Sequence, residues 1–119
     1  MKSYFAISLL VLLAVSACDP KTELSVGFDS GFDPGGYGTT VLSIDNALDK
    51  VYLEGMVKTD SGSVTVQLLY PSGSVAWHST LSGQNEIQVN EMFDSSPGDW
   101  VLKYESTDGA GTMKLTLHN

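Results

Sequence analysis

The stretches 64–70 (VTVQLLY), 100–104 (WVLKY) and 113–117 (MKLTL) largely alternate apolar and polar residues. Successive side chains of a β-strand point to opposite faces of the sheet, so this period of two indicates strands with one buried and one solvated face. The stretch 51–57 (VYLEGMV) has the same period. Weaker alternation predicts two further inward pairs, Val75 with Trp77 and Ile87 with Val89.

Turn residues separate these stretches at regular intervals from Thr39 onward. They fall at Asp45-Asn46, Asp60-Ser61-Gly62, Pro71-Ser72-Gly73, Ser82-Gly83-Gln84, Ser96-Pro97-Gly98-Asp99 and Thr107-Asp108-Gly109. A spacing of roughly 8 to 15 residues is typical of successive antiparallel strands. About seven or eight short strands bury their apolar faces only by stacking two sheets or by closing a barrel. The sequence therefore predicts an all-β protein, an antiparallel β-sandwich of jelly-roll or immunoglobulin-like type.

Composition limits the classes of function. The chain has 119 residues, with 6 Lys+Arg against 14 Asp+Glu, so its formal charge is −8. A chain this short holds one small domain, which excludes a two-domain enzyme. The negative charge is unsuited to neutralising phosphates, so nucleic acid is not expected as a partner. One Cys and two His leave neither an internal disulfide nor a structural zinc site.

The N-terminal residues are typical of a secretory signal. Only Lys2 is charged within residues 1–17, and the run from Phe5 to Val15 is apolar apart from Ser8. At about 1.5 Å per residue this run spans roughly 16 Å, well short of the ~30 Å thickness of a bilayer core. It is therefore expected to be a signal peptide and not a permanent membrane span.

The residues Val15-Ser16-Ala17-Cys18 resemble the lipobox of bacterial lipoproteins. This resemblance implies acylation of the Cys18 thiol, cleavage before Cys18, and attachment to the extracytoplasmic side of the bacterial membrane. Two or three acyl chains hold a protein durably, so the lipid bilayer would be a partner. In enteric bacteria an Asp at the next position, here Asp19, resembles an inner-membrane retention signal. The alternative is a secreted protein that begins with an unpaired Cys.

The chain is accordingly divided into a signal peptide (1–17), a lipidated Cys with a flexible tether and loop (18–38), and a β-sandwich domain (39–119). Residues 27–38 are rich in Gly and Asp without a sustained period, which predicts an irregular loop. A short strand is expected near Leu24 to Phe28.

The segments 64–75, 97–104 and 111–117 together resemble the C-terminal half of jelly-roll modules attached to secreted proteases. These are the P domain of proprotein convertases and the bacterial pre-peptidase C-terminal domain. The resemblance covers about 55 residues and rests on a Pro-Ser-Gly turn and on a Gly-x-Trp-x-Leu strand. It implies a non-catalytic accessory module.

Catalytic residues are not evident. A hydrolytic site would need His78 within hydrogen-bond reach of both a Ser and a carboxylate, yet the alternation turns His78 toward solvent. His118 is the penultimate residue, and no Gly-x-Ser-x-Gly elbow occurs. Most acidic residues lie beside Gly or Ser, where they stabilise turns. We therefore expect a protein that is not an enzyme, and a small hydrolase is the least favoured alternative.

Two sets of residues are candidates for binding. Phe28, Phe32, Tyr37 and Phe93 lie outside the predicted strand pattern, where their rings are able to stack on a sugar or to seat a partner protein. Alternatively, these rings plug the open ends of the sandwich. Asp29 and Asp33 offer oxygens to Ca²⁺, the only cofactor considered, although a plain flexible loop is the favoured reading.

The leading functional hypothesis is an envelope module that binds a glycan or another ligand. The alternative is an accessory lipoprotein that docks on another envelope protein and has no small-molecule site.

Overall fold

The computed structural model describes residues 24–45 and 50–119. The predicted signal peptide, Cys18 and part of the turn predicted at Asp45-Asn46 lie outside the described residues. The strands are β1 (Ser25–Phe32), β2 (Tyr37–Ile44), β3 (Val51–Ser61), β4 (Ser63–Leu69), β5 (Val75–Ser82), β6 (Asn85–Phe93), β7 (Gly98–Ser106) and β8 (Ala110–His118).

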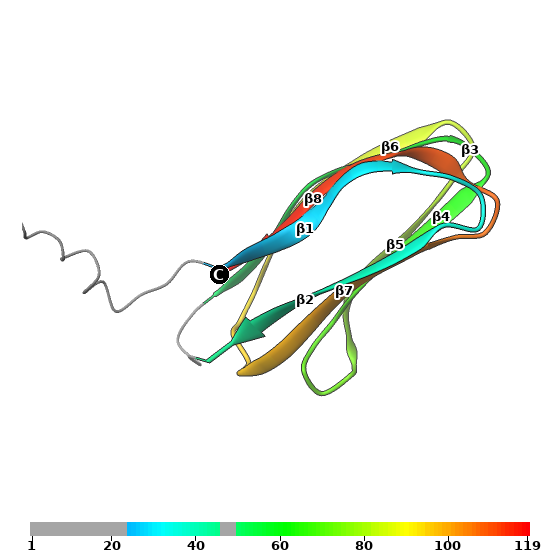
Figure 1. Ribbon diagram of the computed structural model, residues 1–119. Coiled ribbons are helices and arrows are strands. Elements are labelled where there is room, and N and C mark those ends of the chain that lie inside the picture. The colour runs from blue at the N-terminus through cyan, green and yellow to red at the C-terminus, as the bar shows by residue number, and fades with distance from the viewer. Residues whose placement is uncertain (1–23, 46–49) are drawn as a thin grey trace, which may run out of the picture.

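These strands form two four-stranded antiparallel sheets packed face to face (Figure 1). One sheet has the order β1-β8-β3-β6 and the other β2-β7-β4-β5. Two sheets of four strands match the jelly roll and not the immunoglobulin arrangement, which places its strands in different sets. The predicted β-sandwich is therefore confirmed, and the topology selects one of its two predicted types.

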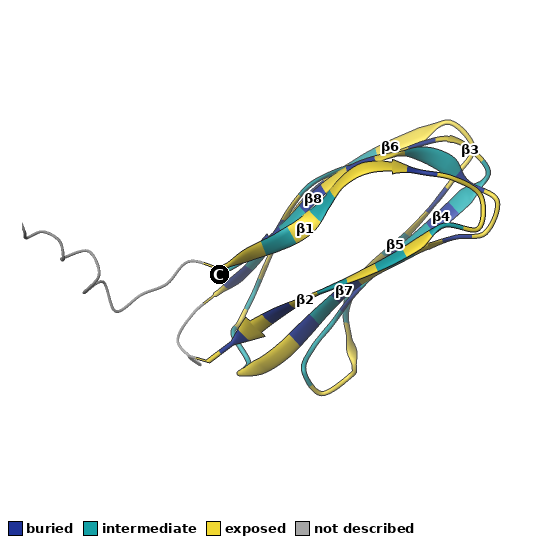
Figure 2. Cartoon of the chain, viewed as in Figure 1, coloured by how far each residue is buried: buried dark blue, intermediate teal, exposed yellow. Residues whose placement is uncertain are grey.

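The core lies between the sheets, where the predicted inward faces meet. Figure 2 shows buried residues recurring along the strands of both sheets. The fully buried large side chains are Leu42, Val51, Leu53, Val57, Val64, Val66, Leu68, Leu81, Trp100, Leu102, Leu115 and Leu117. The alternation in stretches 51–57, 64–70, 100–104 and 113–117 thus predicted the packing face correctly.

One inward prediction is wrong. Val75 was expected to face the core with Trp77, but its side chain is 48% exposed. The β4–β5 register pairs Leu68 with Trp77 and then Leu69 with Val75, so Ala76 is an extra residue in β5. Such a bulge changes the side to which the following residues point, because strand side chains alternate. Val75 consequently lies on the outer side with Leu69.

The predicted irregular loop at 27–38 is also corrected. The short strand expected near Leu24 to Phe28 is present but extends over residues 25–32 as β1, and β2 begins at Tyr37. The glycines hid the strand, although Val26, Phe28 and Phe32 do follow a period of two. A Cβ atom at Gly27 would lie 2.0 Å from the carbonyl oxygen of Leu115, so β1 approaches β8 too closely there for a side chain.

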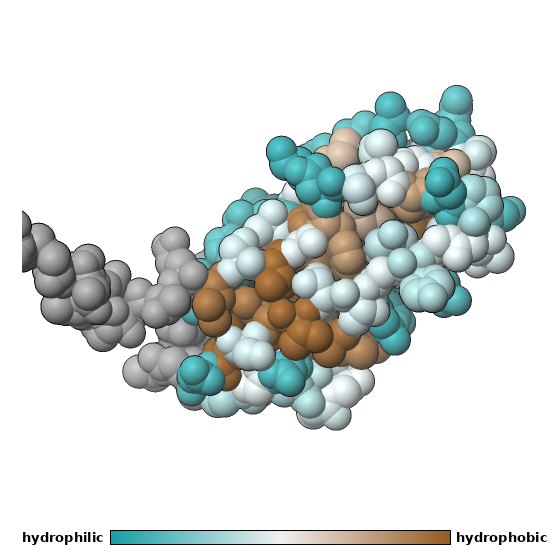
Figure 3. Space-filling model, viewed as in Figure 1, coloured by the Kyte–Doolittle hydropathy of each residue, from teal (hydrophilic) through white to brown (hydrophobic). Residues whose placement is uncertain are grey.

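The two sheets are open to solvent along the edge between β1 and β2. Figure 3 shows apolar surface gathered at this edge. Phe28 crosses it from β1, because a Cβ atom at Gly38 of β2 would lie 3.1 Å from the Phe28 ring. The Phe28 ring also meets Tyr104 edge-on, with centroids 5.0 Å apart. This aromatic contact covers the core where no further strand does.

Candidate functional site

A polar hollow lies on the outer face of the β2-β7-β4-β5 sheet. Its volume is about 380 Å³, and we call it the Tyr37 trough. It is lined by Tyr37, Thr39, Thr65, Gln67, Lys103, Tyr104 and Glu105. Three strands, β2, β4 and β7, therefore contribute to one site.

Strand register brings these residues together in two rows. Glu105 of β7 is paired with Tyr37 on one side and with Thr65 on the other. In the next row, Lys103 is paired with Thr39 and with Gln67. Paired residues two apart in a strand lie on the same face, so both rows project from the same surface.

The Tyr37 ring forms the rim of the trough. It is 80% exposed, more than any other large apolar side chain among the described residues. The next residue, Gly38, has no side chain because a Cβ atom there would lie 2.6 Å from the Tyr104 ring. An exposed ring beside a polar floor offers an apolar face and hydrogen-bonding groups within one site.

The charges in the trough are balanced, and its other groups are neutral. Lys103 and Glu105 contribute one charge of each sign, while Thr39, Thr65 and Gln67 contribute two hydroxyls and an amide. The Thr65 hydroxyl shares a 3.0 Å hydrogen bond with that of Thr80 on β5. Hydroxyls and amides both donate and accept, so the floor suits a neutral ligand that itself carries hydroxyls.

The structure does not bring the four predicted rings together in one site. Among the predicted rings, only Tyr37 lines the trough. Phe32 is 5% exposed and lies in the core, and the half-buried Phe28 packs against Tyr104. Phe93 packs against Trp100 with ring centroids 5.9 Å apart. These three phenylalanines correspond to the alternative in which rings plug the sandwich.

The predicted calcium ligands are not brought together. Asp29 lies in β1 opposite Lys114, whereas Asp33 follows the strand and its carbonyl accepts a hydrogen bond from the Gly36 N–H. Three residues of extended chain lie between them, so their Cα atoms are about 13 Å apart, too far for both carboxylates to bind one ion. Within the described ranges, no group of three or more His, Cys, Asp or Glu residues is placed to hold a metal.

The predicted histidines occupy different surroundings. His78 is exposed on β5 opposite Gln67, and among residues 24–45 and 50–119 its ring forms no hydrogen bond. His118 instead stacks on Tyr52 and lies 3.2 Å from the Glu54 carboxylate. The three groups that the hydrolase hypothesis required are not assembled around His78 in this part of the chain.

Sequence reasoning missed most of the trough. Alternation alone places Thr65, Gln67, Lys103 and Glu105 on the solvated sides of their strands. The alternation shows which side they occupy, but not that β7 lies between β2 and β4.

In the described part of the chain, no helix has the length and apolarity needed to cross a bilayer.

No model of a known protein family matches this sequence, and a search of curated proteins found no similar one. The resemblance to protease-associated jelly rolls therefore stays a prediction. Among solved structures, the fold is similar to a carbohydrate-binding module, CBM36, in complex with calcium and xylotriose. The TM-score is 0.51 and the identity 9%, over 81% of this chain and 99% of that chain.

A second similar structure is the CBM36-1 domain of a multidomain xylanase from the hindgut metagenome of Trinervitermes trinervoides. Its TM-score is also 0.51 at 9% identity, over 82% of this chain and 97% of that chain. At such identity the likeness concerns the fold alone. The chain shares the β-sandwich architecture of these modules.

Proposed function

We propose that this chain is a non-catalytic module that binds oligosaccharides in the Tyr37 trough and is tethered to the extracytoplasmic side of a bacterial membrane through acylated Cys18. The observation that carries the binding proposal is the exposed Tyr37 ring beside hydroxyl and amide groups from three strands. The C–H face of a sugar ring packs on an aromatic ring, while its hydroxyls exchange hydrogen bonds with the floor.

Two further points support a glycan ligand. The balanced charges of Lys103 and Glu105 do not favour a strongly charged ligand. One protein with a similar fold was solved with xylotriose, so this architecture is able to hold an oligosaccharide. The proposal for this chain requires no metal, because the trough offers direct hydrogen bonds.

Removal of the Tyr37 ring tests the proposal. We expect xylotriose, cellotriose or chitotriose to shift backbone amide signals around Thr65 and Gln67 in NMR titrations of the purified chain. An aromatic contact contributes about 0.5–1.5 kcal/mol, so Tyr37→Ala should weaken binding by about two- to tenfold. The ring is 80% exposed, so the variant should keep its melting temperature.

Val75→Ala is the matched control, since Val75 is 48% exposed on the same sheet but does not line the trough. This variant should bind like the wild type. Unchanged affinity in Tyr37→Ala, or no shifts around the trough with any of the three sugars, would refute the glycan proposal.

An apolar row on the same face favours a second candidate function, docking on an envelope protein. Register places Val41 beside Val101, Val101 beside Leu69, and Leu69 beside Val75. Val41 and Val75 are 43% and 48% exposed. If this row is the functional surface, Val41→Asp should abolish a defined complex isolated from the host membrane, whereas Tyr37→Ala should leave that complex intact.

A further inference from the structure

A second trough lies on the opposite side of the molecule, on the outer face of the β1-β8-β3-β6 sheet. Two adjoining hollows form it, of about 270 Å³ over β1 and β8 and about 670 Å³ over β8, β3 and β6. Lys114 and Thr116 line both hollows, so the two hollows adjoin on β8. We call it the β8 trough, and its polar lining residues are Ser25, Asp29, Glu54, Gln88, Asn90, Lys114, Thr116 and His118.

Two glycines allow the backbones of β1 and β3 to approach β8 closely beneath the β8 trough. A Cβ atom at Gly27 would lie 2.0 Å from the Leu115 carbonyl oxygen, and one at Gly55 would lie 1.8 Å from that of Lys114. Gly55 also has a φ of +140°, which side chains rarely allow. Strands β1 and β3 therefore approach the β8 backbone closely, and no side chain of either glycine fills the depression.

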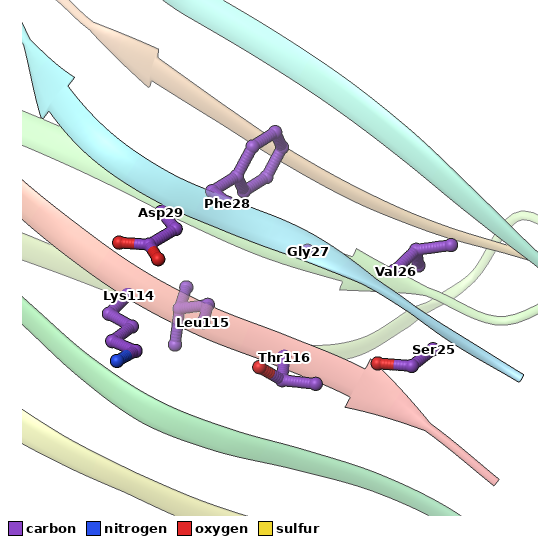
Figure 4. A pocket seen from close by; sticks show the side chains of 8 residues that line it. All are labelled: Ser25, Val26, Gly27, Phe28, Asp29, Lys114, Leu115 and Thr116. Carbon is purple, nitrogen blue, oxygen red and sulfur yellow. The ribbon is translucent and has the colours of Figure 1, made fainter.

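The side chains around this floor alternate as hydrogen-bond donors and acceptors. Register places Glu54 between Asn90 and Thr116. Asp29 is the direct partner of Lys114 at the β1 side. Figure 4 shows these two side chains beside each other, with Phe28 directed to the opposite side of β1. The trough holds one ammonium group, of Lys114, and two carboxylates, of Asp29 and Glu54. Its charge therefore disfavours a phosphate or another polyanion.

His118 lines one end of the β8 trough, and Tyr52 stacks on it from outside the lining. Tyr52 and His118 lie with centroids 5.2 Å apart and planes inclined by 20°. The Nε2 atom of His118 is 3.2 Å from Glu54 Oε1, which fixes the orientation of the imidazole. An oriented aromatic pair beside carboxylate, amide and hydroxyl groups repeats the combination found in the Tyr37 trough.

We infer that the β8 trough is a second oligosaccharide site, so that the module holds two neutral glycan chains on opposite faces. Four strands at a spacing of about 4.8 Å give the trough a length of about 14 Å, longer than one sugar ring. The ligand class is therefore a neutral oligosaccharide and not a monosaccharide. This inference rests on the proposed function for its ligand class and for the first of the two sites.

Amide shift mapping of the full chain with xylotriose, cellotriose and chitotriose tests the second site. We expect two sets of shifts, one around Thr116 and Asn90 and one around Thr65 and Gln67. Asn90→Ala removes a hydrogen-bonding amide from an exposed position on an edge strand. The sugar affinity measured from the shifts around Thr116 should fall up to about tenfold, while the affinity measured around Thr65 and Gln67 should not change. Thr116→Ala repeats the test from β8.

Glu91→Ala is the matched control, because Glu91 is exposed on the same strand as Asn90 but does not line the trough.

A second readout is turbidity with the polymer of whichever trisaccharide binds. Two sites on opposite faces cross-link polymer chains, so the wild type and Glu91→Ala should form turbid complexes. Asn90→Ala and Tyr37→Ala should each reduce the turbidity.

The outcomes separate the two proposals. Shifts confined to the Tyr37 trough would overturn the second site and leave the proposed function standing. Shifts confined to the β8 trough would support this inference and move the binding function away from Tyr37. No shifts in either trough with any probe would overturn both.

Discussion

Gly62 and Gly83 have the same backbone conformation in different surroundings. Both have a φ of +69°, a left-handed conformation that disfavours any residue with a Cβ atom. A Cβ atom at Gly62 would lie 2.0 Å from the Asp108 carbonyl oxygen, whereas one at Gly83 would have no atom within 4 Å. Substitution of Gly83 therefore measures the cost of backbone strain alone, whereas substitution of Gly62 adds the cost of the steric clash.

We expect Gly83→Ala to lower the free energy of unfolding by about 1 kcal/mol, the cost of placing Ala in this conformation. Gly62→Ala should cost about 3 kcal/mol, because the turn before Gly109 must also move away from the new methyl group. Urea denaturation of both variants measures the difference. Equal losses would show that the contact at Asp108 relaxes without cost.

At the scale of the strand, prediction from sequence worked where a strand is buried on one face and flanked on both sides. In β3, β4, β7 and β8, alternation indicated which residues enter the core, and the buried set confirms it. For β1 the predicted short strand near Leu24 to Phe28 is present but continues to Phe32, because the glycines at 27 and 31 of this edge strand interrupt the pattern. Prediction failed at Val75, because a bulge cannot be read from the alternation.

The candidate site was predictable only in part for the same reason. Tyr37 was identified because an aromatic residue in a Gly-rich segment is conspicuous. Its neighbours Thr65 and Glu105 belong to strands far apart in the sequence, and they meet through the sheet order β2-β7-β4. A single sequence carries no signal for that order, so the polar floor could not be assembled from it.

An ion pair extends the β3–β6 ladder beyond its last pair of residues. Val51 is paired with Phe93, and the adjacent Lys50 and Asp94 form a hydrogen-bonded salt bridge. The side-chain hydrogen bond from Lys50 and its charge lower the pKa of Asp94 below 3.8, and the same contact raises the pKa of Lys50 above 10.5. The salt bridge is thus present at neutral pH.

The Asp94 carboxyl should titrate below its ordinary value in an NMR pH titration. Because the folded-state pKa of Asp94 is lowered, its stabilising contribution is present above the ordinary pKa and disappears as the pH falls through the folded value. Lys50→Ala should raise the midpoint toward the ordinary value, whereas Lys58→Ala, within β3, should not. High salt should reduce the shift, because both groups are exposed. A midpoint unaffected by Lys50→Ala would contradict this assignment.

At the scale of the whole molecule, the chain enters and leaves the sandwich at one end (Figure 1). The Leu24 N–H donates to Asn119 Oδ1 at 2.8 Å, and the Asn119 N–H donates to the Leu24 carbonyl at 3.3 Å. Tyr37 begins β2 after the turn at the other end of β1. A membrane anchor at the N-terminal side would therefore place the Tyr37 trough toward the distal end of the domain.

The anchor itself is tested by Cys18→Ser in a bacterial host. Five residues separate Cys18 from Leu24, and these six Cα–Cα steps reach at most about 22 Å, so acylation would hold the sandwich close to the bilayer. Two or more acyl chains bind membranes durably, so the wild type should fractionate with membranes and carry the added lipid mass. Cys18→Ser should lose that mass and leave the membrane fraction, while Ser25→Ala, a control within the strand, should retain both properties. If Cys18→Ser differs from the wild type in mass only by the change of sulfur to oxygen and has the same membrane yield, the protein is not anchored through this thiol. The glycan sites would then have to act in a secreted protein or in one held by another contact.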